Sequence, residues 1–201
     1  MTFLKTVVAA AALVFTGAGA QSATFDFDAM GNAFEASYAD FAANGAVNGM
    51  LTNGGVSITN MTATGDAGEY AYLDGGNYAG LGACAEVDCA GNSDDNLTFP
   101  ETVTVMFDRI VTAFEVLLNG NHAAFGDGWI DINGGTYAVT GGVADLTGLA
   151  ASNSYTFSNP VNQSGEGAYI SSMTVIPLPA AGFLLLGGLG GLVALGRRKA
   201  A

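Results

Sequence analysis

Carboxylates dominate the polar chemistry of this 201-residue chain, which has 18 Asp and Glu residues against five Lys and Arg. The densest group of oxygen ligands lies in one stretch and consists of Asp88, Asp94, Asp95 and Asn96. Hard cations such as Ca2+ bind clustered carboxylate and amide oxygens. The spacing does not match an EF-hand loop. We therefore predict a candidate Ca2+ site at these residues, the one cofactor that the sequence suggests, with a solvated acidic surface as the alternative.

Catalytic groups other than carboxylates are scarce. His122 is the only histidine, and the chain holds no Gly-x-Ser-x-Gly nucleophile motif. A Ser–His–acid mechanism needs both groups in contact. The sequence therefore predicts a protein that is not an enzyme, with His122 on a surface loop. The alternative is a secreted glycan-active hydrolase that uses two of the carboxylates.

The only tryptophan suggests a sugar contact. Trp129 begins an expected strand after a Gly-rich loop, and Asn121 and Asp127 precede it. An exposed indole stacks on a sugar ring, while amide and carboxylate groups accept or donate hydrogen bonds to hydroxyls. We predict Asn121, Asp127 and Trp129 as candidate glycan contacts. A core tryptophan is the alternative.

The two cysteines, Cys84 and Cys89, are separated by four residues. Two thiols do not complete a zinc site, which needs four ligands, and their spacing differs from the redox Cys-x-x-Cys motif. Residues 1–20 have the pattern of a signal peptide, and in an exported chain such a pair predicts a local disulfide.

Short apolar–polar alternations with Gly and Asn turns must position these groups. Alternation at residues 24–28, 56–61, 101–107 and 110–118 predicts strands. We expect residues 108–109 to turn, with Ile110, Thr112, Phe114, Val116 and Leu118 then sharing one face. Shorter strands are expected at 70–73, 129–133, 136–140, 155–158 and 168–175, a helix at 32–45, and a long loop at 74–99. The fold class predicted is an all-β, antiparallel β-sandwich of jelly-roll type, with a barrel as the alternative.

Both ends of the chain have the pattern of membrane-directed segments. Residues 1–20 combine Lys5, an apolar run and Ala18-Gly19-Ala20, which predicts a signal peptide. Residues 176–195 carry no charge, and Arg197, Arg198 and Lys199 follow, which predicts a C-terminal transmembrane helix with a cytoplasmic basic end. Residues 21–175 are left as one extracellular domain. A buried core segment is the alternative for the C-terminal run, and a lasting membrane helix is the alternative for the N-terminal one.

The C-terminal segment resembles a known sorting signal. Its residues are Ile176, Pro177, Leu178, Pro179 and Ala180, then a Gly/Leu-rich span and the basic end. This order resembles the VPLPA-type tail, a relative of the PEP-CTERM tails of Gram-negative bacteria, although Ile176 stands before the proline pair and Val175 precedes it. The resemblance implies an exosortase-type membrane peptidase as partner and cleavage near the Pro-Leu-Pro motif. Cys84, Cys89, residues 93–96 and 101–108 also resemble a β-sandwich module of such proteins, which implies fold alone.

Charge and targeting together limit the function. All 18 acids lie between Asp26 and Glu166, where Arg109 is the only Lys or Arg, so the domain repels nucleic acid. We expect a non-catalytic protein that is exported through the Sec translocon and cut by signal peptidase. It is then held in the inner membrane and released to the cell surface or extracellular matrix. There it binds exopolysaccharide or serves as a structural component.

Overall fold

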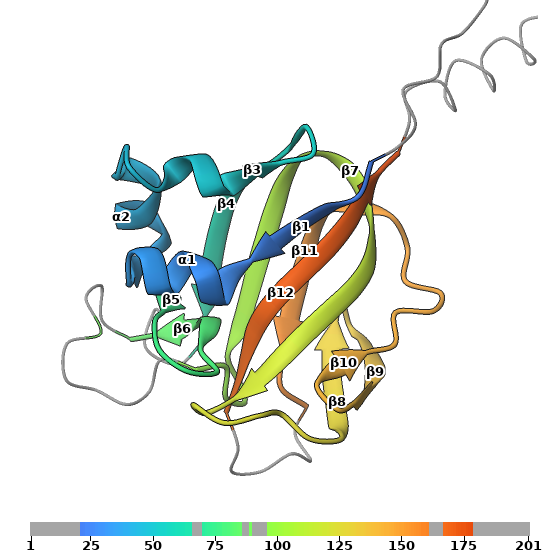
Figure 1. The fold of residues 1–201 in the computed structure, drawn as a ribbon. Coiled ribbons are helices and arrows are strands. Elements are labelled where there is room, and N and C mark those ends of the chain that lie inside the picture. Colours follow the sequence, from blue (N-terminus) through green and yellow to red (C-terminus); the bar gives the residue numbers. More distant parts are fainter. Residues whose placement is uncertain (1–20, 66–69, 86–88, 90–95, 161–166, 179–201) are drawn as a thin grey trace, which may run out of the picture. The chain divides into compact units, whose positions relative to one another are not determined.

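One long strand, β7 (Thr102–Gly120), organises the fold, because β4, β10, β11 and β12 all pair with it (Figure 1). The computed structural model describes residues 21–65, 70–85, 89, 96–160 and 167–178, which belong to one compact unit, Ala20–Leu178. The elements before β7 are β1 (Ala23–Asp26), α1 (Phe27–Ala33), β2 (Ala36–Ser37), α2 (Tyr38–Ala43), the 3-10 helix η1 (Asn48–Leu51), β3 (Thr52–Asn53), β4 (Val56–Thr64), β5 (Tyr70–Asp74) and β6 (Gly80–Cys84). After β7 come β8 (Gly128–Ile132), β9 (Gly135–Thr140), β10 (Val143–Ala144), β11 (Ser152–Ser158) and β12 (Ala168–Pro177).

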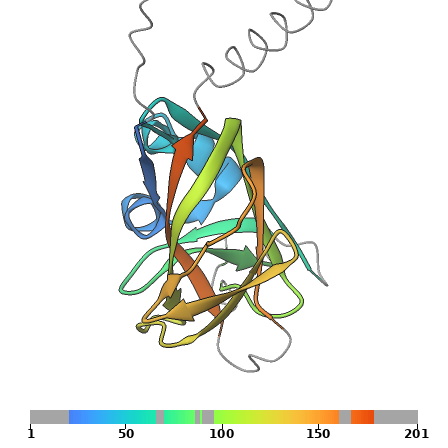
Figure 2. The same cartoon turned by 90° about the vertical axis from the view of Figure 1, so that its right-hand side faces the viewer.

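The strand pairings form one barrel-like antiparallel sheet. From β7 the path runs through β11, β8, β9 and β10 and returns to β7, so these strands close a ring. On its other part, β7 pairs with β12, which continues through β6 and β5 to β2. Figure 2 views the sheet from the side on which β8, β9 and β10 lie. The all-β, antiparallel part of the prediction is confirmed, and the sheet has the barrel-like form that the sequence ranked second to a sandwich.

The inward face of the first half of β7 is the one that the alternation predicts. Val103, Val105 and Phe107 are buried, and the ring of Phe107 packs against Phe25 and Tyr155 at centroid distances of 5.6 and 6.3 Å. Burial of each such side chain stabilises the fold by about 1.5–3 kcal/mol. The strands predicted at residues 56–61, 70–73, 129–133, 136–140, 155–158 and 168–175 lie wholly or largely within observed strands, whereas the strand predicted at 24–28 ends at Asp26, and Phe27 and Asp28 begin α1.

The predicted turn at residues 108–109 is wrong, because β7 passes through this point as one bent strand. Pairing with β11 jumps from Met106–Ser154 to Val111–Ser152, so several residues of β7 bulge outward. The buried Tyr155 hydroxyl replaces the missing ladder bonds: it donates to the carbonyl oxygen of Val111 at 2.8 Å and accepts the N–H groups of Ala113 and Ser152 at 3.1 and 3.2 Å. Burial raises the pKa of Tyr155.

A second irregularity corrects the predicted face of residues 110–118. Val116 and Leu118 are buried as expected, but Ile110 and Phe114 are 45% and 65% exposed. The register with β12 shifts between Thr174 and Val175, which face Glu115 and Ala113. Such a bulge reverses which side chains point inward, so strict alternation fails across it.

The helical region also differs from the prediction of one helix at 32–45. Asp26 caps α1 by accepting the N–H of Ala29 at 2.9 Å, and Ser37 caps α2 by accepting the N–H of Asp40 at 3.4 Å. Two N-caps with a short strand between them start two short helices. Gly31 is required in α1, because a Cβ there would overlap the backbone carbonyl of Asp74.

The described elements correct the predicted loop at 74–99 and leave the predicted terminal segments untested. The expected loop at 74–99 contains β6, whose five residues are all buried and include two glycines, so they carry no alternation that reveals a strand. Among the described residues, no helix is long and apolar enough to cross a bilayer. The predicted signal peptide, and the predicted tail from Pro179 and Ala180 through Arg197, Arg198 and Lys199, lie outside the described residues.

Candidate functional site

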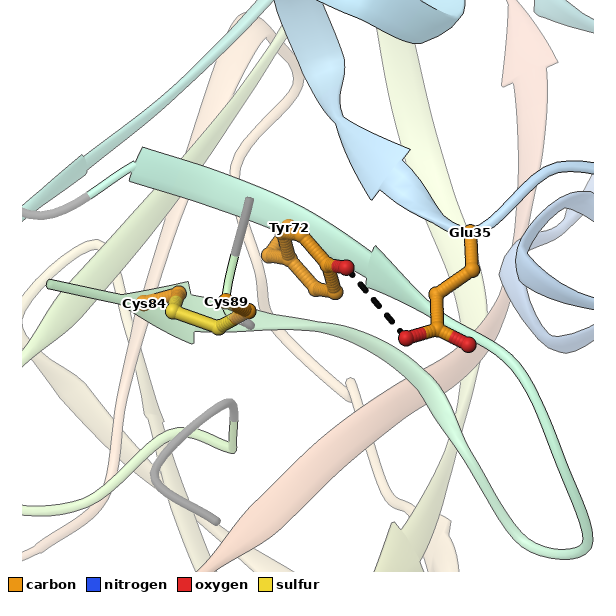
Figure 3. The surroundings of a disulfide bond; sticks show 4 residues. All are labelled: Glu35, Tyr72, Cys84 and Cys89. Atoms are coloured by element: carbon orange, nitrogen blue, oxygen red, sulfur yellow. Dashed lines mark hydrogen bonds between the residues drawn. A yellow bond between two sulfur atoms is a disulfide. The ribbon is translucent and has the colours of Figure 1, made fainter. Parts of the chain in front are cut away.

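The predicted disulfide is present and closes a small loop beside β6 (Figure 3). The Cα atoms of Cys84 and Cys89 are 6.1 Å apart, and both residues are buried with Tyr72 in a small cluster of their own. The hydroxyl of Tyr72, on β5, donates to Glu35 Oε1 at 3.3 Å. The bond therefore ties the end of β6 to a cluster that also reaches the segment between α1 and β2.

The candidate calcium ligands are only partly described. Asp88, Asp94 and Asp95 lie outside the described residues. Asn96 is buried, and its Oδ1 has no hydrogen-bond partner among the described residues. A Cβ at Gly167 would overlap this amide, so Asn96 packs directly on the backbone of that glycine. Within the described part, no group of three acidic, His or Cys side chains could hold a metal, and the calcium site stays a prediction.

The candidate glycan residues lie along one stretch but in different settings. Trp129 is 54% exposed on β8, which answers the alternative that it is a core residue. Asp127 is exposed, and its Oδ1 accepts the N–H of Gly141 at 2.9 Å, so this carboxylate stabilises the turn after β9. Asn121 is exposed in the bend that follows β7. Of the three, Trp129 has the setting that a sugar-stacking residue needs.

His122 lies against a buried acid that the sequence did not single out. Its Nε2 is 3.5 Å from Oδ2 of Asp74, at the end of β5, and its ring is 5.6 Å from that of Tyr169 between centroids. The φ angle of His122 is 51°, in the left-handed region that few residues adopt. The grooves described on this domain are lined by other residues. The pair thus joins two loops and meets no described cavity.

A broad surface of hydroxyl groups covers the outer side of the sheet beside Trp129. Outward positions on β4, β7, β11, β8 and β9 alternate with buried ones, and strand pairing places them in rows. One row crosses all five strands. We call this surface the hydroxyl face; it consists of Thr62, Thr64, Thr102, Thr104, Ser154, Thr156, Ser158, Asp131 and Thr136.

Hydrogen bonds couple these side chains in pairs across strands. The Oγ1 atoms of Thr64 and Thr102 are 2.7 Å apart, and those of Thr104 and Thr156 are 2.8 Å apart. A hydroxyl carries one donor and two acceptor lone pairs, so each coupled pair keeps one O–H donor and several lone pairs for a ligand. Neighbouring strands lie ~4.8 Å apart, which sets the spacing of the hydroxyls along a row.

The charge and shape of the hydroxyl face favour a neutral, flexible ligand. Asp131 is its only charged member, and its carboxylate accepts a hydrogen bond from Thr136 at 2.5 Å. Trp129 is two residues before Asp131 on the same side of β8. Adjacent strands rotate by roughly 20–25°, so five strands form a curved surface and not a flat lattice.

The sequence contains a further signal for this surface, beside the predicted site residues. Hydroxyl residues stand at every second position in 62–64, 102–104 and 154–158. Alternation along residues 101–107 places Thr102 and Thr104 on one face of the strand and Val103 and Val105 on the other. The side-by-side order of the three hydroxyl segments follows only from the pairing of β4 and β11 with β7. Comparison of the chain with protein-family models, with curated proteins and with solved structures found no match.

Proposed function

We propose that this protein is an exported, non-catalytic component of the cell surface or extracellular matrix that binds neutral polysaccharide through the hydroxyl face and Trp129. The observation that carries the proposal is the row of outward polar side chains across five strands, with hydroxyl pairs on β4, β7 and β11, a Thr136–Asp131 pair on β9 and β8, and an exposed indole at its border. Sugars present the same amphoteric hydroxyls and apolar ring faces. Each exposed hydrogen bond contributes only about 0.5–1.5 kcal/mol, so a polymer that contacts many rows is favoured over a single sugar.

Net charge supports a neutral ligand. Residues 21–178 contain all 18 acids and Arg109 as the only Lys or Arg, so a polyanionic glycan is repelled. The hydroxyl face holds one of these acids, and Thr136 already binds it. A neutral chain meets no electrostatic penalty there.

The export part of the proposal rests on the two terminal segments. Residues 1–20 serve as a signal peptide for the Sec translocon and signal peptidase, and 176–201 as a sorting tail for an exosortase-type peptidase. β1 pairs with the end of β12, with Ala23 opposite Val175, so the first and last described strands have their outer ends side by side (Figure 1). That arrangement suits a chain whose two ends meet one membrane.

The start of the sorting motif belongs to the folded domain. Ile176 and Pro177 pair with Thr112 and Val111 in the sheet, and the N–H of Leu178 donates to the carbonyl oxygen of Ile110 at 3.2 Å. A peptidase needs an extended, accessible substrate, so we place the cut beyond Leu178. The mature domain then keeps β12 intact.

Retention on immobilised polysaccharides tests the binding proposal. Residues 21–178 are run through gels or columns that contain neutral or anionic glycans, and we expect retardation by a neutral one. Trp129→Ala and the double variant Thr102→Val/Thr156→Val should each weaken retention severalfold, because one removes the stacking surface and the other the central hydroxyls.

The matched control is Thr24→Val/Thr174→Val, which removes a similar hydroxyl pair, 2.9 Å apart, on β1 and β12. It should leave retention unchanged. If the control variant loses as much retention as Thr102→Val/Thr156→Val, polysaccharide binding cannot be assigned to the hydroxyl face. No retention on any matrix glycan would reject glycan binding, and release of reducing ends would instead support the hydrolase alternative.

A further inference from the structure

At one end of the domain, the start of β1 and the end of β12 lie beside β3 and the bend of β7, and hydrogen bonds connect these segments. Asn53, the last residue of β3, donates through Nδ2 to the carbonyl oxygen of Thr24 at 2.7 Å. The N–H of Ser57 donates to Asp108 Oδ1 at 3.1 Å, in the bend of β7. Leu178 bonds to Ile110 in the same bend. Figures 1 and 2 both show the bend of β7 and the ends of β1 and β12 together at this end of the molecule.

Apolar side chains are exposed on the strands that form this end. Ile110 and Phe114 point outward from β7, with Thr112 between them, and Leu178 is 39% exposed. Ile176 is half-buried and pairs with Thr112. Together they form an apolar strip over adjacent strands, which we call the seating strip (Ile110, Thr112, Phe114, Ile176 and Leu178). Exposed apolar strips of this kind mark interaction surfaces.

Charge at the bend of β7, beside Ile110 of the seating strip, differs from the rest of the acidic domain. The bend holds one acid and one base, Asp108 and Arg109, which form an ion pair with 2.7 Å between Oδ2 and Nη2. Arg109 lowers the pKa of Asp108 through this hydrogen bond. The N-terminal residues 21–25 and the turn at 53–55 carry no charged side chain. The bend is therefore close to neutral, whereas Glu115 and Asp145 line one groove with Thr112 and Phe114 of the strip.

Chain continuity decides what can cover the strip. The residues from Pro179 to Leu195 carry no charge, and because Pro177 and Pro179 do not fit inside a helix, we expect the predicted transmembrane helix to begin near Ala180. Two residues span at most ~7 Å. If the tail inserts as proposed, Leu178 cannot lie farther than this from the point where the chain enters the membrane interface.

We propose that the seating strip lies against the surface of the lipid bilayer while the tail is in place, so that the domain is held in one orientation and not free to turn about a linker. Ile110, Phe114 and Leu178 then contact the interfacial region, and Arg109 lies at the headgroups, as amphipathic interfacial segments do. This inference rests on the membrane insertion of the tail. The row of the hydroxyl face that crosses all five strands lies away from the bend: Ser158, in that row, is six residues along β11 from Ser152 at the bend, or ~20 Å, whereas Ser154 is only two residues from it.

The test is site-specific fluorescence of the full chain in vesicles of phosphatidylethanolamine and phosphatidylglycerol. Both native cysteines form the disulfide, so a single introduced cysteine can be labelled selectively. Thr112→Cys places an environment-sensitive dye within the seating strip, and Thr136→Cys places it on the hydroxyl face as a matched control. Lipids with a headgroup spin label should quench the dye at Thr112→Cys severalfold more than the dye at Thr136→Cys.

The inserted tail alone brings the domain near the bilayer, and this closeness could by itself cause quenching. A second variant distinguishes that effect from direct contact of the seating strip with lipid. Adding Ile110→Ser/Phe114→Ser to Thr112→Cys should cause a severalfold loss of quenching, because the strip no longer favours the interface. Unchanged quenching in that variant, or equal quenching at both probes, would overturn the inference. Shielding of the Thr112→Cys dye from aqueous iodide without lipid quenching would show that a protein partner, such as a second copy, covers the strip.

Failure of the tail to insert into the bilayer gives a result that differs from failure of the strip to contact lipid. A chain that does not float with the vesicles, or that alkaline carbonate extracts, would overturn the proposed insertion and this inference with it. Stable insertion with unquenched Thr112→Cys would overturn the seating alone.

Discussion

Replacing Tyr155 by Phe removes one oxygen atom from the bend of β7 and should destabilise the whole domain. The hydroxyl makes three short contacts there, to the carbonyl oxygen of Val111 and to the N–H groups of Ala113 and Ser152. The residue is fully buried, so water cannot easily replace it. The ladder with β11 is interrupted here, because its register jumps from Met106–Ser154 to Val111–Ser152, while β12 pairs with Val111, Thr112 and Ala113 on the other edge of β7.

The magnitude follows from the groups left without partners. A buried donor or acceptor without a hydrogen bond costs about 1–3 kcal/mol, and partial relaxation of a bend reduces the sum for three such groups. We expect Tyr155→Phe to lower the free energy of unfolding by about 2–4 kcal/mol, a large share of the about 5–15 kcal/mol typical of a domain. The phenolic oxygen is lost while the ring and its packing on Phe107 remain.

Urea unfolding of residues 21–178, followed by tryptophan fluorescence and circular dichroism, measures the change. Hydrogen exchange adds a local readout, since the amides of Ala113 and Ser152 should lose protection before the rest of β7. Tyr70→Phe is the control, because Tyr70 is 44% exposed and its loss should stay within about 0.5 kcal/mol. If Tyr155→Phe also lowers the free energy of unfolding by no more than about 0.5 kcal/mol, the claim that this hydroxyl stabilises the bend is refuted.

Three further predictions concern the disulfide, an acidic pair and calcium. Cys84→Ser/Cys89→Ser should lower stability by about 2 kcal/mol, the loop-closure value for so short a loop, measured by urea unfolding against the oxidised parent; an equal midpoint would contradict it. Burial, followed by repulsion from Asp26, raises the pKa of Asp28, so its ionised form opposes folding at neutral pH. Asp28→Asn should therefore raise the melting temperature slightly at pH ~7 and lose that advantage as pH falls below the ordinary carboxyl pKa of ~3.9; a pH-independent difference would exclude this cause. Calcium should raise the melting midpoint and EDTA should reverse the change, because a ligand bound only to the folded chain stabilises it; an unchanged midpoint would reject the site.

Local alternation predicted the strands well because each has one buried and one exposed side. It failed at the bend and the bulge of β7, where an unpaired residue reverses the inward face, and nothing in Asp108-Arg109-Ile110 distinguishes a bend from a turn. It also failed at β6, since the Gly-Leu-Gly-Ala-Cys stretch is buried on both sides. Register between distant strands is a property of the folded sheet, and it alone aligns Thr64 with Thr102 and Ser158.

The candidate sites were predictable to different degrees for the same reason. A short-range disulfide needs only two nearby cysteines, and the Cys84–Cys89 prediction is confirmed. The exposure of Trp129 depends on which side of β8 faces the interior of the sheet. The sequence does not determine this side, so it did not decide between an exposed and a core tryptophan. The contact of His122 with Asp74 joins loops 48 residues apart in the chain, beyond the reach of any local pattern.

Intact-mass measurement of the protein recovered from the surface of the cells that produce it tests most directly the central claim, that the terminal segments are transit devices around one folded domain. Export and sorting predict a species that begins at Gln21 and ends shortly after Leu178, with β1 and β12 both complete. A surface species that still carries Arg197 and Arg198 would contradict removal of the tail, and one that starts at Met1 would contradict the signal peptide.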